Sequence, residues 1–220
     1  MEVTLPHSAA SHGEGLQPVV ALKRRTIDVV LIALGTVLVA VLAVAGGLLT
    51  WGHNFAADFV HDELSSQQVF FPDADGLNAE GRTDLLSYAG KQVTTGDEAR
   101  AYASYIGHHL EGIANGMTFA ELGGPETAAK NDLKAAQEAG KPAAEIAELQ
   151  AKVDQIGGQR NTLFKGETLR GLLLTAFAWS TVGRIAGIAA TVAYIAAGVM
   201  LLLVIAGLIH VARNKPVQTR

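Results

Sequence analysis

The chain has 220 residues, a formal net charge of −4 and a hydrophobic share of 49%. That balance is typical of a small protein with a large apolar fraction. There is no cysteine, so a disulfide framework, a thiolate metal site and a thiol nucleophile are all excluded. Any folded domain must therefore be held together by packing alone.

Two segments account for most of the apolar share. Ile27 to Leu49 holds one charge, Asp28, and Ile185 to Ile209 holds none. As helices they would each reach roughly 35 Å, enough to cross a hydrocarbon core of about 30 Å. The sequence thus predicts transmembrane helices at residues 27–50 and 185–209, preceded by a disordered tail at residues 1–22 and followed by a basic tail at residues 210–220.

Basic residues near the ends of spans favour the cytoplasmic side. Between Gly52 and Gly81 there is no lysine or arginine, as expected outside the cell. The basic residues that set the orientation lie before the first segment or after the second: Lys23, Arg24, Arg25, Arg213, Lys215 and Arg220. We expect a multi-pass protein of the cell membrane with both termini cytoplasmic and residues 51–184 extracytoplasmic.

A cleaved signal peptide is the alternative reading of the first segment, with Ala43 to Ala45 as the cleavage motif. The apolar run is longer than an ordinary signal sequence and continues through Leu49, which favours an uncleaved anchor. Whether residues 27–45 are cleaved stays open at this stage.

Residues 51–184 show the period of helices, with little alternation of β-branched residues. The predicted fold is all-α, with two long antiparallel transmembrane helices that extend into a small helical extracytoplasmic domain. We expect the first helix to run on to about Val69, where Pro72 and Gly76 favour a turn. TDLLSYAGK, residues 83–91, predicts a short helix.

The next helix has Thr95 or Asp97 as its N-cap and ends near Asn115 and Gly116. Thr118 and Glu121 have capping-box spacing. Residues 125–141 predict a partly ordered helix. A further helix follows Pro142, with a weak point at Gly157 and Gly158 before the second span.

The apolar run from Leu169 to Val211 would measure about 65 Å as one helix, too long for a single crossing. No turn signal divides it, so we expect one crossing from Ile185, preceded by a helix at Leu172 to Thr181 that is buried in the domain core. Arg184 then lies at the membrane interface, with its guanidinium in water or against lipid phosphate. A functional arginine inside the membrane is the alternative.

Trp51 and Trp179 flank the outer ends of the two spans, where amphipathic aromatic rings are common. If Trp51 lies level with Gly183, Arg170 forms an ion pair with Asp62 or Glu63. The residues expected at the membrane interface are Trp51, Trp179, Arg184, Lys23, Arg24, Arg25, Arg213 and Lys215.

One face of the second span carries small residues: Gly183, Gly187, Ala189, Ala193 and Ala197. Such faces allow helix backbones to approach closely in lipid. Two partners are compatible with this pattern: another protein or copy of the chain, and the chain's own first span around Gly35, Ala43 or Gly46.

Histidines and carboxylates suggest a metal site only weakly. His108 and His109 are neighbours, so their side chains point about 100° apart on a helix, and His61 lies on a different helix. No metal ligand set, cofactor or catalytic residue is predicted, because the motifs of serine hydrolases and phosphate-binding loops are missing as well. Residues 52–183 carry 18 acidic and 10 basic side chains, which does not suit a nucleic-acid surface.

The segments FFPDADG, LLSYAGKQVTTGDEARAYASYIGHHLEGIANGMTFAEL and TLFKGETLRGLLLTAFAW resemble a group of uncharacterised actinobacterial membrane proteins with two spans. Some of those proteins carry the name aromatic ring-opening dioxygenase, an activity that needs an iron site for which this chain has no convincing ligand set. The resemblance implies a location and a layout, and it brings no functional residues.

We therefore expect a non-catalytic membrane protein that serves as an accessory subunit, a scaffold or an oligomer. Its partners would be membrane lipid and other envelope proteins or further copies of itself, without nucleic acid. A ligand- or metal-binding sensor is the second hypothesis and an enzyme on the outer face the third.

Overall fold

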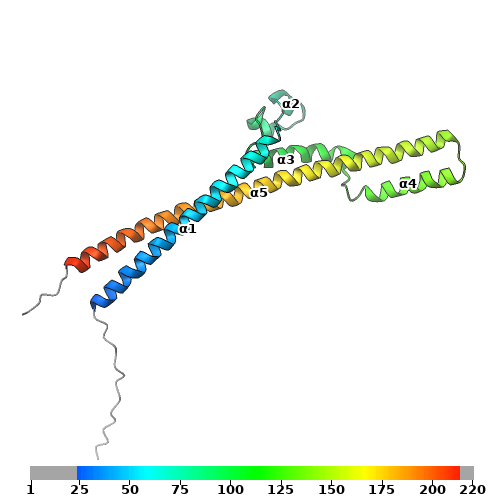
Figure 1. Ribbon diagram of the computed structural model, residues 1–220. Coiled ribbons are helices and arrows are strands. Elements are labelled where there is room, and N and C mark those ends of the chain that lie inside the picture. The colour runs from blue at the N-terminus through cyan, green and yellow to red at the C-terminus, as the bar shows by residue number, and fades with distance from the viewer. Residues whose placement is uncertain (1–23, 214–220) are drawn as a thin grey trace, which may run out of the picture. The chain divides into compact units, whose positions relative to one another are not determined.

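A computed structural model describes residues 24–213, and in that part the chain is helical with no strand beyond a single bridge between Phe70 and Gln92. The elements in chain order are α1 (Arg24–Ser66), α2 (Ala74–Ala79), the 3₁₀ helix η1 (Thr83–Tyr88), α3 (Gly96–Glu111), the 3₁₀ helix η2 (Ile113–Gly116), α4 (Gly123–Glu138) and α5 (Ala143–Arg213). Figure 1 labels the five α-helices. The predicted all-α class is confirmed. The predicted tails, with Lys23 and Lys215, lie outside the described residues.

Helices α1 and α5 are each long and apolar enough to cross a membrane. Only 6% of the most apolar stretch of α1 and 11% of that of α5 is buried within the chain. The two long apolar helices that the sequence predicts are therefore present, and their apolar side chains face outward for most of their length.

The chain divides into two compact units, and α1 and α5 pass through both. The smaller unit holds the described residues up to Val41 and those from Ala196 onward. In this unit a Cβ added at Gly35 would lie 2.8 Å from Cγ2 of Val204. Glycine at this position lets the two helices approach closely, as small residues do in membrane helix pairs.

The larger unit runs from Leu42 to Ile195. Along α1 its buried and half-buried positions include a series at steps of three and four residues: Leu42, Gly46, Leu49, His53, Ala56, Val60 and Leu64. This spacing places one stripe of the helix against a neighbour and is typical of helices packed at a shallow angle. A Cβ added at Gly46 would lie 2.8 Å from Cε1 of the Tyr194 ring on α5.

The main core of the larger unit joins the end of α1 to α2, η1, α3 and α5. Its buried members are Val60, Leu64, Phe71, Leu77, Leu85, Val93, Ala99, Ala103 and Leu173. Phe71 stacks on Tyr88 with ring centroids 5.2 Å apart and meets the ring of Tyr102 edge-on at the same distance. Aromatic and aliphatic side chains from these short elements and from the ends of the long helices fill the core.

Helix α1 ends at Ser66, three residues before the predicted end at Val69. The side-chain amide of Gln92 donates to the carbonyl oxygen of Ser65 at 2.8 Å, and Gln68 adopts a positive φ of 50°. The last carbonyls of a helix need partners from outside it. A side chain from a distant loop provides one here, in addition to the backbone amides of Gln67 and Gln68.

Helix α3 is capped by Thr95 and not by Asp97. The hydroxyl oxygen of Thr95 accepts from the amide of Glu98 at 3.3 Å, and the carboxylate of Glu98 accepts from the amide of Thr95 at 2.9 Å. This is a complete capping box. The helix ends at Glu111, and the chain then turns through Ala114 and Asn115, which have φ of 52° and 57°.

Helices α4 and α5 form a hairpin. Residues 125–138 of the helix predicted at residues 125–141 belong to α4, which ends at Glu138. The predicted capping box forms just before α4, with Thr118 and Glu121 exchanging hydrogen bonds of 2.8 and 3.3 Å. Helix α5 continues without a break through Gly157 and Gly158, which have no side-chain neighbour that a Cβ would meet. The predicted weak point is therefore not a break.

Candidate functional site

Helix α1 of the same chain packs against the small residues Gly183 and Gly187 of α5. A Cβ on Gly183 would lie 2.8 Å from Cβ of Ala56, and one on Gly187 would lie 3.0 Å from Nδ1 of His53. His53 also places Nδ1 2.8 Å from the carbonyl oxygen of Gly183. Of the two partners that the pattern allows, the structure shows the chain's own first long helix at these two glycines.

The other members of the small-residue face differ in exposure. Ala193 and Ala197 are buried, whereas Ala189 is half-buried. Of the residues expected on the facing helix, Gly46 contacts Tyr194 and Gly35 contacts Val204, but Ala43 is exposed. The face is thus used largely for packing inside the chain.

The N-terminus of α3 packs directly on α5. A Cβ on Gly96 would lie 2.6 Å from Oγ of Ser180 and 3.2 Å from Cα of Phe177. One turn further along α3, the guanidinium of Arg100 lies 4.8 Å from the centroid of the Phe177 ring. Because any side chain at Gly96 would collide with α5, glycine here sets how closely the two helices approach.

Arg184 forms an ion pair with the first turn of α3. Its guanidinium donates to a carboxylate oxygen of Asp97 at 2.9 Å, and its side chain remains 55% exposed. The aromatic residues that were expected nearby, Trp51 and Trp179, are also exposed. Asp97, considered from the sequence as a helix cap, instead holds the arginine that interrupts the apolar run.

The ion pair predicted between Arg170 and either Asp62 or Glu63 is not formed. Arg170 pairs with Glu167 at 3.2 Å on its own helix and lies beside Gly107 of α3, where a Cβ would be 3.3 Å from Nε. The prediction assumed that Trp51 lies level with Gly183.

The structure instead places His53 and Ala56 at Gly183. This shifts the register of the two helices by about one turn. At the shifted register Arg170 lies near the level of the end of α1 at Ser66, farther from Asp62 and Glu63 than the prediction assumed. It lies next to α3 instead.

An apolar groove lies between α1 and α5 above these contacts, with a volume of about 370 Å³. Its larger apolar lining residues are Phe59, Leu64, Leu169, Leu172, Leu173 and Trp179. The prediction that Leu172 to Thr181 is buried in the core is correct for one face only, because Leu173 is 5% exposed while Leu172 is 64% exposed.

An aromatic ladder leads along α1 to this groove. Trp51 stacks on Phe55 with ring centroids 5.7 Å apart, and Phe55 stacks on Phe59 at 6.2 Å. All three side chains are exposed. A contiguous apolar surface of this kind marks contact with lipid or with another protein.

The candidate metal ligands do not converge. The rings of His108 and His109 are 6.2 Å apart, and His109 lies within 3.5 Å of the Glu80 carboxylate. His61 is exposed on α1. Among residues 24–213 no group of three histidine, aspartate or glutamate side chains could hold a metal ion.

Tyr105 is the most perturbed titratable group near these histidines. Burial, together with its hydrogen bond to the carboxylate of Glu80 at 3.2 Å, raises the pKa of Tyr105 to about 12. The phenol therefore stays protonated at neutral pH and acts as a donor. With His109 in edge contact with Tyr105 at 4.5 Å, these residues tie α3 to Glu80 at the end of α2.

Two charged networks that the sequence did not single out hold the domain together. Arg82 is almost buried and donates to both carboxylate oxygens of Asp84, at 2.9 and 2.8 Å, and to the carbonyl and hydroxyl oxygens of Ser104. The hydrogen bond from Arg82 lowers the pKa of Asp84. This arginine fixes η1 against α3, and no local motif distinguishes it from other loop arginines.

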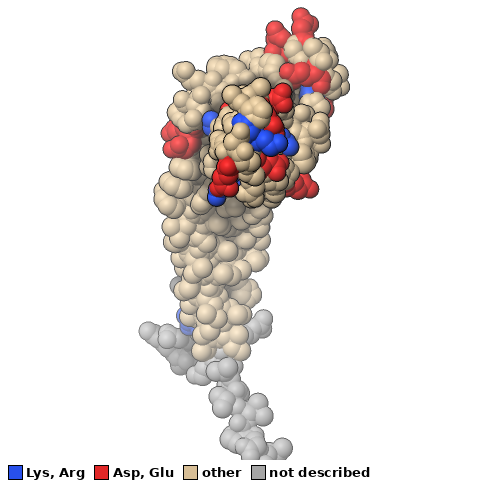
Figure 2. Space-filling view, turned by 90° about the vertical axis from the view of Figure 1, so that its right-hand side faces the viewer, with Lys and Arg blue, Asp and Glu red and all other residues tan. Residues whose placement is uncertain are grey.

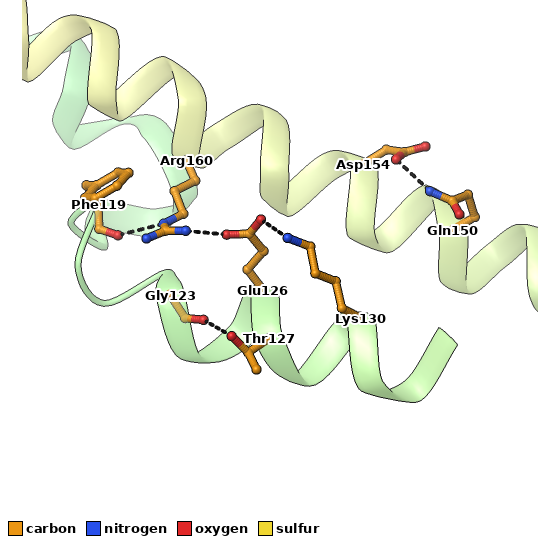
Figure 3. A network of polar contacts seen from close by, with 8 residues as sticks. All are labelled: Phe119, Gly123, Glu126, Thr127, Lys130, Gln150, Asp154 and Arg160. Atoms are coloured by element: carbon orange, nitrogen blue, oxygen red, sulfur yellow. Dashed lines mark hydrogen bonds and ion pairs between the residues drawn. The ribbon is translucent and has the colours of Figure 1, made fainter. Parts of the chain in front are cut away.

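The second network clamps the hairpin of α4 and α5 (Figure 3). Glu126 accepts from Lys130 and from Arg160, each at 2.6 Å, and these bonds lower its pKa. Arg160 also lies over the ring of Phe119 at 4.2 Å. Such charged contacts gather on the hairpin and the smaller helices, while the apolar stretches of α1 and α5 present an uncharged surface in Figure 2.

A comparison of the chain with protein-family models, curated proteins and solved structures finds no match. The resemblance to actinobacterial membrane proteins therefore stays a prediction.

Proposed function

We propose that the chain is an integral membrane protein that crosses the bilayer with α1 and α5 and works as a scaffold or accessory subunit. In this proposal both termini are cytoplasmic and residues 51–184 are extracytoplasmic. The basic residues Arg25 and Arg213 at the ends of the described helices support that orientation.

The low burial of the two apolar stretches supports a membrane location. A helix in the core of a soluble protein is mostly buried, whereas these stretches are 6% and 11% buried. Exposure of so many large aliphatic side chains to water would be very costly, at about 25 cal/mol per Å² of apolar surface. Lipid removes that cost.

The same contacts argue for an uncleaved first helix. Cleavage after Ala45 would remove Gly35 and its close contact with Val204. It would also leave the apolar stretch of α5 in the smaller unit without its partner helix. If the first helix is an uncleaved anchor, its small residues pack against α5. If it is a cleaved signal peptide, those contacts are lost.

One observation carries the scaffold proposal: exposed apolar side chains occur along a greater length of both helices than a bilayer is thick. From Arg25 to Phe59 helix α1 rises about 51 Å, and from Arg213 to Leu172 helix α5 rises about 61 Å. A bilayer with its headgroups measures about 40–45 Å. The groove at Phe59 and Leu172 would then lie outside the membrane, where an apolar partner surface is needed to cover it.

Crosslinking at a single position tests this function. A photoreactive residue in place of Leu172, an exposed side chain of the groove, should give a discrete protein adduct in intact cells. The same residue in place of Lys152, which is exposed on the hairpin part of the same helix, should not give that adduct. An adduct of twice the chain mass would identify a second copy as the partner.

The proposal fails if Leu172 and Lys152 give the same pattern and the chain is a monomer in mild detergent. The topology has its own test, which the lack of native cysteine makes simple. In intact cells a membrane-impermeant maleimide should label Gln137→Cys on the hairpin and should not label Thr219→Cys near the C-terminus. Labelling in the reverse pattern would invert the orientation.

A further inference from the structure

A polar cleft of about 440 Å³ lies between α1 and α5, on the larger unit, at the point where His53 packs on Gly187. Its polar lining side chains come from both helices: Thr50, His53, Arg184, Thr191 and Tyr194. We propose that this cleft binds a phosphate group, carried by a lipid headgroup or present as free phosphate.

Arg184 is the residue that makes the cleft suitable for an anion. A guanidinium offers five N–H donors in a planar fork that matches the oxygens of phosphate. One nitrogen of Arg184 is committed to Asp97 at 2.9 Å, and the side chain is half exposed. The ion pair holds the guanidinium in place from one side and leaves its other donors for a ligand.

The phenol of Tyr194 provides a second donor. Thr50 donates its single hydroxyl proton to the carbonyl oxygen of Gly46 at 2.8 Å, and its oxygen lies 3.4 Å from that of Tyr194. Thr191 likewise donates to the carbonyl oxygen of Gly187 at 3.0 Å. Because both threonine protons are used within the helices, only Tyr194 can donate a hydroxyl proton to a bound anion, by giving up its long contact with the Thr50 oxygen.

His53 adds a third polar group whose tautomer the structure determines. Its Nδ1 lies 2.8 Å from the carbonyl oxygen of Gly183, an acceptor only, so Nδ1 carries a proton. Nε2 is then the ring nitrogen left to accept a hydrogen bond in the cleft that His53 lines. It can accept a hydrogen bond from a protonated phosphate.

The position of the cleft favours a lipid as the source of the phosphate. Helix α1 rises about 42 Å from Arg25 to His53, and α5 rises about 43 Å from Arg213 to Arg184. Both lengths match a bilayer measured with its headgroups, about 40–45 Å. If the proposed two-span placement holds, the cleft lies level with the outer headgroups, beside uncharged residues such as Ile188 that lipid chains can cover.

Lipid binding to the full chain in detergent micelles tests the inference by native mass spectrometry. Phosphatidylglycerol is compared with diacylglycerol that has the same acyl chains and no phosphate. We expect Arg184→Gln to weaken phosphatidylglycerol binding about tenfold, the effect of losing hydrogen bonds from one charged group. Tyr194→Phe should weaken it less, and diacylglycerol binding should not change in either variant.

Two further variants separate ligand binding from loss of the fold. Arg170→Gln removes another half-exposed arginine of α5 that pairs with Glu167 outside the cleft, and it should bind like the parent chain. Asp97→Asn breaks the ion pair but keeps the guanidinium, so it should bind phosphatidylglycerol at least as tightly as the parent. If Asp97→Asn loses binding as fully as Arg184→Gln, the arginine acts by holding α3 and the inference is wrong.

Inorganic phosphate distinguishes the two sources of the ligand. A rise in melting temperature with millimolar phosphate, lost in Arg184→Gln, would identify free phosphate as a ligand. A response to phosphatidylglycerol alone would identify the headgroup. If neither ligand depends on Arg184, or if diacylglycerol binds as well as phosphatidylglycerol, the cleft is not a phosphate site. That result would leave the crosslinking test at Leu172 unaffected.

Discussion

The contact between Gly183 on α5 and Ala56 on α1 allows a test of how the two long helices pack. A Cβ on Gly183 would lie 2.8 Å from Cβ of Ala56, which is itself only 3% exposed. Carbon atoms do not pack at that distance, so Gly183→Ala must push the helices apart. Ala56→Gly in the same chain removes the atom that it meets.

The expected magnitudes follow from two opposing effects. Overpacking a close contact costs about 1–3 kcal/mol, and replacing glycine by alanine in a helix gains about 1 kcal/mol. Gly183→Ala should therefore lower the free energy of unfolding by about 0–2 kcal/mol. Ala56→Gly should lower it by about 2 kcal/mol, through lost helix propensity and a lost buried methyl group.

In the double variant the two helix-propensity changes cancel and the contact is rebuilt with its methyl group on the other helix. Its free energy of unfolding should be close to that of the parent chain, so the two changes are coupled by about 2–4 kcal/mol, the sum of the two single losses. For a chain of this length 1 kcal/mol corresponds to about 2–4 °C in melting temperature.

Thermal unfolding in mild detergent measures these differences, with Gly171→Ala as the matched control. Gly171 lies in the same helix, and a Cβ there would meet no atom within 4 Å. The control should be more stable than the parent by about 0.5–1 kcal/mol. If the two single changes add within about 0.5 kcal/mol, Gly183 and Ala56 are not in contact and the packing described here is wrong.

Three further predictions concern the helical domain, each measured by the melting temperature. Thr95→Ala removes the N-cap of α3 and should cost about 1 kcal/mol. Burial acts to raise the pKa of Glu98, but the hydrogen bonds it accepts from Thr95 and the residue before it outweigh this and lower that pKa. The stability that the Glu98 carboxylate contributes is therefore complete above its unfolded pKa of about 4.5 and is lost as the pH falls through the lower folded pKa. The decline in melting temperature below about pH 5 should be shallower in Glu98→Gln than in the parent chain. An equal decline in both would contradict this. Glu126→Gln should destabilise the hairpin more than Glu138→Gln, because Glu126 joins both helices through Arg160 while Glu138 is exposed and pairs only within α4; equal losses would show that the network in Figure 3 adds no stability.

Local patterns were enough to predict the helices and several of their ends. The composition of residues 27–49 and 185–209 predicted two long apolar helices, because an uninterrupted apolar run of that length is typical of a helix that crosses a membrane. Thr95 was one of two predicted caps of α3 and is the cap in the structure, and the predicted capping-box hydrogen bonds of Thr118 and Glu121 form in the turn before α4. These signals are readable because both partners of each contact lie within one turn of the chain.

Long-range partners were not predictable in the same way. The last turn of α1 accepts a hydrogen bond from the side chain of Gln92, and the buried Arg82 donates to Ser104. The pair proposed for Arg170 was wrong because it rested on a guessed register. A shift of one turn between two helices changes every contact along them while leaving each helix pattern the same.

The amino-acid sequence by itself thus determined the helical class, the two apolar segments and the glycine and alanine face on α5. The tertiary structure decided what that face contacts, the pairing of Arg184 with Asp97, and the positions of the apolar groove and the polar cleft. The physical reason is that periodicity and composition act within one helix. The register between two helices is set by which side chains fit where backbones meet, as His53 and Ala56 do at Gly183 and Gly187.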